Sequence, residues 1–163
     1  MRASEDISDV ARVSGIAMSV LVAEDNAIYQ MLMKKLLAAY GYSVSVVDNG
    51  LAALEALDKY DYDIVFMDLQ MPDMDGLEAT RQIVMRFKDN HPTIIAMTAS
   101  SIGDDVEACF EAGVDDYIRK PIKSQDIETI LNKWCKEKAS NLLLPLRMSM
   151  GVTDSHICWG LIS

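Results

Sequence analysis

Charged side chains stand at the ends of short apolar runs in this chain, where a strand would give way to a loop. Glu24 and Asp25 follow one such run, and Asp68 follows another. If these carboxylates lie close together, they repel by about 4 kcal/mol per pair at an effective dielectric of 20, unless a cation lies among them. Oxygen ligands favour Mg²⁺ or Mn²⁺, so the pattern predicts a site for one of these ions.

Lys120 and Thr98 also stand at the ends of predicted strands. Next to a metal ion, a carboxylate such as Asp68 can act as a nucleophile on phosphorus, and the product is an aspartyl phosphate. An ammonium and a hydroxyl are suited to hold the other phosphoryl oxygens, because phosphoryl transfer is catalysed mainly by positioning and charge neutralisation. The residue types therefore predict phosphoryl chemistry centred on Asp68.

The elements that must position these residues alternate along the chain. Runs of apolar and β-branched residues predict strands, and apolar residues at helical spacing predict helices between them. The strands are expected at 18–23, 43–47, 64–67, 93–98 and 116–119, and the helices at about 28–39, 50–57, 77–87, 103–112 and from 124 onward. This order predicts an α/β fold, a doubly wound five-stranded parallel sheet with five helices of the flavodoxin-like type.

Two helices carry further expectations about their buried faces. In the second helix, Leu51, Leu54 and Leu57 are expected to share one face. In the first helix, Met31 and Met33 are interpreted as core residues. A strand that carries no polar alternation, such as Ile64–Met67, is expected to be buried on both faces.

Length and composition limit the classes of protein that fit. The chain has 163 residues and a formal charge of −10, which argues against a nucleic-acid partner. Its three cysteines are far apart, which fits a reducing compartment, and it has no apolar run long enough to cross a bilayer. We expect a cytoplasmic or nuclear protein, monomeric as an isolated domain, with a lead-in at 1–17, a domain at 18–138 and a tail of unknown role at 139–163.

Four motifs at the strand ends carry a resemblance to a known family. They are VLVAEDN at 20–26, FMDLQMPDMDG at 66–76, MTAS at 97–100 and DDYIRKPI at 115–122. In this order they resemble the receiver domain of two-component response regulators, and their sequences are most similar to those of receivers of hybrid histidine kinases. The resemblance covers most of the chain and implies membership of a phosphorelay.

The resemblance also implies a role for each site residue. Asp68 would be the phosphoacceptor, Thr98 and Lys120 would contact the phosphoryl group, and Lys120–Pro121 would be a cis peptide bond. The implied metal ligands are Glu24, Asp25, Asp68 and the backbone carbonyl of Gln70, and the implied switch residues are Thr98 and Tyr117. Phosphorylation would change the surface of the fourth helix, the last strand and the last helix.

The implied partner is a histidine kinase or a histidine phosphotransfer protein, which would dock on a surface that includes Ile28, Tyr29 and Ile122. Tyr29 departs from the subfamily, which usually has Asn there. We expect this change to affect partner choice and to leave the phosphorylation chemistry untouched. The chain would catalyse only its own phosphorylation and dephosphorylation, so it would not be an enzyme in the usual sense. It would be either a stand-alone receiver or a piece of a hybrid kinase. In the second case it could be the cytosolic portion of a larger membrane-associated kinase.

Three alternatives remain open at this point. A pseudo-receiver would dock partners without being phosphorylated. A phosphatase of the haloacid dehalogenase type needs a second Asp two residues after its nucleophile, where this chain has Gln70. A flavodoxin-like cofactor binder needs a phosphate loop rich in Ser, Thr and Gly, where this chain has Glu24 and Asp25.

Overall fold

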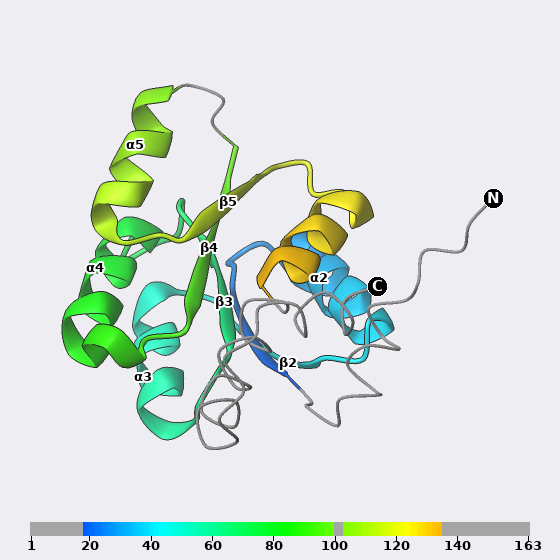
Figure 1. The fold of residues 1–163 in the computed structure, drawn as a ribbon, viewed down its shortest axis with the longest axis horizontal. Coiled ribbons are helices and arrows are strands. Elements are labelled where there is room, and N and C mark those ends of the chain that lie inside the picture. Colours follow the sequence, from blue (N-terminus) through cyan, green and yellow to red (C-terminus); the bar gives the residue numbers. More distant parts are fainter. Residues whose placement is uncertain (1–17, 100–102, 135–163) are drawn as a thin grey trace, which may run out of the picture. The chain divides into compact units, whose positions relative to one another are not determined.

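A computed structural model describes residues 18–99 and 103–134 of the chain (Figure 1). Five parallel strands form one sheet in the order β2-β1-β3-β4-β5. The strands are β1 (Ser19–Ala23), β2 (Ser43–Val47), β3 (Ile64–Asp68), β4 (Thr93–Thr98) and β5 (Asp116–Arg119). The sheet lies wholly in the first of two compact units, Met1–Glu128, and the second unit is Thr129–Ser163.

Helices connect the strands, as parallel pairing requires. They are α2 (Ala27–Ala39), α3 (Gly50–Lys59), α4 (Gly76–Phe87), the short 3-10 helix η1 (Lys88–Asn90) and α5 (Gly103–Ala112). A further helix begins at residue 124 and is described to residue 134. The predicted fold class is therefore confirmed, and each described boundary lies within a few residues of its predicted position.

Strand β3 lies in the middle of the sheet, and each of its residues is buried. Successive side chains of a strand point to opposite faces. Val65 and Met67 belong to an apolar cluster with residues of α3, α4 and α5, whereas Phe66 is buried on the other face. Both faces are thus covered, as the uninterrupted apolar run predicts.

Polar side chains at the strand-to-helix loops fix where the helices begin. The side chain of Asn26 accepts hydrogen bonds from the backbone at the start of α2, Asn49 does so for α3, and Asp75 does so for α4. An oxygen at this position satisfies backbone N–H groups that have no partner within the helix. Helix α2 ends at Ala39, and Gly41 lies just beyond it with a φ of 86°, which residues with a Cβ rarely adopt.

The expected faces of two helices are partly wrong. Leu54 and Leu57 are buried, but Leu51 is 54% exposed because α3 turns Gly50 towards the core instead. A Cβ at Gly50 would lie 3.0 Å from the carbonyl oxygen of Met74, so this helix start approaches a neighbouring loop closely. The buried face of the first turn of α3 therefore contains Gly50 and not Leu51.

A similar correction applies to α2. Met33 is fully buried together with Leu37, four residues later, whereas Met31 is 61% exposed. Two residues span about 200° around a helix, so Met31 and Met33 lie on opposite sides of it. Only one of these two methionines is a core residue.

The predicted segments 1–17 and 139–163 lie outside the described residues, as does Ser100 of the MTAS motif. Within the described part of the chain, no helix has both the length and the apolar character that a bilayer-spanning helix needs.

Candidate metal and phosphoryl site

Two buried carboxylates meet at the carboxyl ends of β1 and β3. These strands are paired in parallel, with Ala23 opposite Met67, so the next residues, Glu24 and Asp68, arrive side by side. Glu24 is 0% exposed and Asp68 is 3% exposed. Sequence and register together therefore place two acids where open α/β sheets bind their ligands.

Asp25 completes a group of three carboxylates. One carboxylate oxygen from each of Glu24, Asp25 and Asp68 lies within 4.8 Å of the others. Asp25 is exposed, so the group is open to solvent on its side. Glu24 Oε2 is buried, and among the described residues its close polar neighbour is the Lys120 ammonium. An all-oxygen donor set of this charge fits Mg²⁺ or Mn²⁺.

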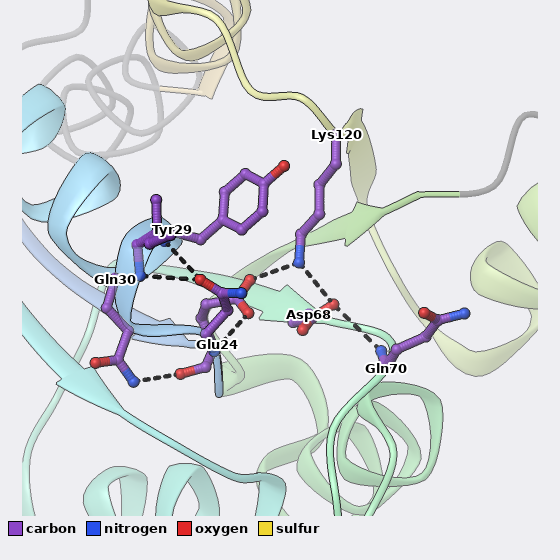
Figure 2. Close-up of polar contacts among 8 residues, drawn as sticks. Glu24, Tyr29, Gln30, Asp68, Gln70 and Lys120 are labelled. Atoms are coloured by element: carbon purple, nitrogen blue, oxygen red, sulfur yellow. Dashed lines mark hydrogen bonds and ion pairs between the residues drawn. The ribbon is translucent and has the colours of Figure 1, made fainter.

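Lys120 is the cation that faces two of these acids. Its Nζ lies 2.7 Å from Glu24 Oε2 and 3.3 Å from Asp68 Oδ1. Figure 2 marks both ion pairs with dashed lines. Burial alone lowers the pKa of Lys120, but its contacts with Glu24 and Asp68 outweigh this effect and raise the pKa above its usual value. The lysine is therefore a fixed positive charge beside the Asp68 carboxylate.

The protonation of Glu24 is strongly perturbed by its surroundings. Burial raises its pKa to about 7, and the contacts with Lys120 and the Asn26 backbone only partly counteract this effect. The neighbouring Asp68 charge also favours the protonated form, and the pKa of about 7 is the net result of these effects. Near neutral pH a proton and a metal ion would therefore compete for the Glu24 carboxylate.

The loop after β3 folds closely over Asp68. The backbone N–H of Gln70 donates to Asp68 Oδ1 at 3.2 Å, which fixes one oxygen of the carboxylate. A Cβ at Gly76 would lie 2.1 Å from the carbonyl oxygen of Asp68, which only a glycine avoids. The Gly that ends the predicted motif is thus required by the close approach of α4 to the strand end.

Thr98 and Tyr117 lie on β4 and β5. Thr98 is 6% exposed, and its carbonyl accepts a hydrogen bond of 2.8 Å from the backbone N–H of Lys120. The Lys120–Pro121 bond is cis, as expected. Tyr117 is half-buried, and its ring contacts Phe110 edge-on at a centroid distance of 6.3 Å. Thr98 therefore lies at the edge that carries the acids, whereas the Tyr117 ring packs on apolar neighbours.

The three residues expected on a partner surface lie in different surroundings. Ile28 is 77% exposed, but Ile122 is only 6% exposed, so Ile122 does not supply an exposed contact in this structure. The Tyr29 ring lies against Lys120, with 4.4 Å between the ring centroid and Nζ. Tyr29 therefore contacts a residue of the site, a contact that the sequence did not indicate.

Two residues that position the acids were not identified from the sequence. The backbone N–H of Asn26 donates to Glu24 Oε1 at 3.0 Å, and the Gln30 side chain donates to the Glu24 carbonyl at 2.5 Å. The signal available for Asn26 was a helix-capping residue type directly after the acid pair. The sequence has no comparable signal for Gln30, because its hydrogen bond to the Glu24 carbonyl depends on the direction of α2 relative to the acid loop.

A family model and several known proteins match this chain. The model of the response regulator receiver domain matches residues 20–132. Transcription factor SKN7 of Saccharomyces cerevisiae is 40% identical over 139 residues, which are 84% of this chain and 22% of that protein. The chain spans less than a quarter of the length of the curated relatives it matches, which include hybrid signal transduction histidine kinases of Dictyostelium discoideum.

Solved structures show the same fold. The receiver domain of sensor histidine kinase PA1611 from Pseudomonas aeruginosa has 35% identity and a TM-score of 0.66, covering 73% of this chain and 98% of that one, and has a magnesium ion in its active-site cleft. The receiver domain of Ssk1 from Saccharomyces cerevisiae, solved with the histidine phosphotransfer protein Ypd1, gives 29% identity and a TM-score of 0.66, covering 72% of this chain and 88% of the matched one.

Proposed function

This chain belongs to the response regulator receiver domain family, and we propose that it accepts a phosphoryl group from a phosphohistidine onto Asp68 with the help of Mg²⁺ or Mn²⁺. The observation that carries this proposal is the meeting of three carboxylates and one lysine at the carboxyl edge of the sheet. Of these acids, Asp68 ends the central strand, and its Oδ1 is fixed by both Gln70 and Lys120.

In the proposed reaction, the Asp68 carboxylate attacks phosphorus, an O–P bond forms, and the P–N bond to the donor imidazole breaks. Lys120 is placed to bind a phosphoryl oxygen because its Nζ already lies 3.3 Å from Asp68 Oδ1. The Thr98 hydroxyl would bind another oxygen from the neighbouring strand. Both groups stabilise negative charge that moves towards Asp68 in the reaction.

The metal ligands in this proposal are Glu24, Asp25, Asp68 and the carbonyl of Gln70. A bound divalent ion would neutralise the carboxylates and draw charge from the phosphoryl oxygens. Support comes from the spacing of the three carboxylates, the burial of Glu24 and Asp68, and the magnesium ion in the receiver domain of PA1611.

The output of the reaction would be a change of surface. The attached phosphoryl group carries up to about two negative charges beside Thr98 and Lys120. We propose that Thr98 moves towards it and that Tyr117 follows, so that the surface of α5, β5 and the helix after them changes in a two-state shift. The exposed acids Glu107 and Glu111 on α5 favour a protein partner over a nucleic acid.

The proposed donor is a histidine kinase or a histidine phosphotransfer protein. Ile28 is an exposed apolar side chain in the first turn of α2, which begins directly beyond Glu24 and Asp25. The Ssk1 receiver domain, solved with a histidine phosphotransfer protein, supports a partner of this class. The chain itself would turn over no separate substrate.

Intact-mass spectrometry after incubation with acetyl phosphate tests the proposal. We expect a gain of about 80 Da that requires Mg²⁺, that is lost on chelation, and that is absent in Asp68→Asn. Asp73→Asn is the matched control, because it removes an exposed carboxylate from the same loop and Asn tolerates its φ of 69°. No gain in the folded wild-type chain, with acetyl phosphate or with a phosphorylated histidine phosphotransfer protein, would instead indicate a pseudo-receiver.

A further inference from the structure

We propose that Tyr29 is a positioning residue for the phosphorylation of Asp68 and that it acts through Lys120. This inference rests on the function proposed above, and it gives Tyr29 a role inside the site rather than only on a partner surface. The observation behind it is the position of the Lys120 ammonium over the Tyr29 ring, 4.4 Å from the ring centroid (Figure 2).

Within residues 18–99 and 103–134, Lys120 Nζ makes two ion pairs and one contact with an aromatic ring. The ion pairs are with carboxylate oxygens, at 2.7 Å in Glu24 and 3.3 Å in Asp68, and the ring is that of Tyr29. The face of an aromatic ring carries partial negative charge, so it attracts an ammonium without forming a bond to one atom. The ring also covers part of a lysine side chain that is 13% exposed.

Binding of a divalent ion would affect the attraction of the Lys120 ammonium to the carboxylates but not its attraction to the ring. A divalent ion on Glu24 and Asp68 would neutralise their charge and repel the ammonium, which weakens both ion pairs of Lys120. The Tyr29 ring is not a ligand of that ion, so its attraction for the ammonium persists. Tyr29 is thus the neighbour able to keep Lys120 over the site at the stage when the phosphoryl group arrives.

The backbone of Tyr29 is held relative to the acids. Tyr29 lies in the first turn of α2, where its N–H donates to the Asn26 side chain at 3.3 Å. Asn26 and Gln30 in turn bond to Glu24, at 3.0 Å to its Oε1 and 2.5 Å to its carbonyl. The ring is therefore carried by a helix start that is tied to the acid loop, which limits how far it can move from Lys120.

The kinetic test compares Tyr29→Phe with Tyr29→Leu. Phe keeps the aromatic face, whereas Leu fills part of the space without it. We expect the rate of phosphorylation by acetyl phosphate to fall about three- to tenfold in Tyr29→Leu and to stay within about twofold of wild type in Tyr29→Phe. If Tyr29 has only a packing role, the two variants should be phosphorylated at the same rate.

A double mutant tests whether the effect of Tyr29→Leu on the phosphorylation rate depends on Lys120. In Lys120→Met the ammonium is absent, so Tyr29→Leu should add no further loss to the residual rate. Equal fractional losses with and without the ammonium would show that Tyr29 acts independently of Lys120 and would overturn the inference.

The NMR shift of the Lys120 ε protons provides a readout that does not depend on activity. Protons over an aromatic face are shifted upfield, so we expect this shift in wild type and Tyr29→Phe, both without metal and at saturating Mg²⁺. It should be lost in Tyr29→Leu. Loss of the upfield shift in wild type on addition of Mg²⁺ would contradict the argument that the ring contact persists in the loaded site.

The outcomes separate this inference from the function on which it rests. If the wild-type chain is not phosphorylated, both the proposed function and the positioning role of Tyr29 are contradicted. A wild-type chain that is phosphorylated, with Tyr29→Leu as fast as wild type, defeats the positioning role alone.

Discussion

The interior and the end of strand β3 show opposite ways of using burial. Ile64–Met67 are apolar, fully buried and covered on both faces of the sheet. The next residue, Asp68, is nearly as buried, yet it lies beside the carboxylates of Glu24 and Asp25. One strand therefore contributes favourable apolar burial along its length and carries an unfavourable group of charges at its end.

The difference indicates which part of the molecule supports stability and which part supports chemistry. Burial of apolar side chains stabilises the fold, whereas buried carboxylates destabilise it unless a cation or hydrogen bonds compensate. In the described residues, Lys120 is the basic side chain that pairs with Glu24 and Asp68. Substitutions in the interior should thus change stability, and substitutions at the strand end should change ion binding and phosphorylation.

The largest expected effect is on the interior. Leu54 is 2% exposed and Leu51 is 54% exposed, although both are leucines of α3. Leu54→Ala should lower the free energy of unfolding by about 2–5 kcal/mol because it leaves a cavity next to β3. Leu51→Ala, the matched control, should change it by less than about 0.5 kcal/mol. Urea denaturation measures both, and similar losses would show that the buried face of α3 is misassigned.

A second prediction concerns the strand end. Glu24→Gln removes one buried carboxylate, so we expect the affinity for Mg²⁺ to fall at least about tenfold, measured by calorimetry. The free energy of unfolding at pH 8 without metal should not fall by more than about 1 kcal/mol, because burial already disfavours this charge. Glu55→Gln on the exposed side of α3 is the control. Unchanged affinity in Glu24→Gln would remove Glu24 from the metal site.

A third, smaller effect is the pH dependence of stability in the metal-free protein. The pKa of Glu24 rises from 4.5 to about 7 on folding, so between these values the folded state holds a proton that the unfolded state has lost. The contribution of Glu24 to stability therefore falls as the pH rises through this interval. Urea denaturation from pH 5 to 8 should show a decline that is shallower in Glu24→Gln. Parallel curves for the two proteins would contradict the raised pKa.

The sequence predicts the parts of the site that depend on topology. Glu24, Asp68 and Lys120 follow strands, and parallel strands in one sheet must bring their carboxyl ends to the same edge. Helix rotations and loop paths depend on packing that a single sequence does not display. For this reason the exposure of Leu51, the burial of Ile122 and the contact of Tyr29 with Lys120 could not be predicted.

The most direct test of the contrast between strand interior and strand end combines two measurements on Asp68→Asn. We predict that this variant takes up no phosphoryl group from acetyl phosphate and Mg²⁺. We also predict that its free energy of unfolding without metal is equal to or greater than that of wild type. Asn can still accept the Gln70 bond at Oδ1, and one of three neighbouring negative charges is gone. Retained phosphorylation, or a loss of stability as large as that of Leu54→Ala, would contradict the account.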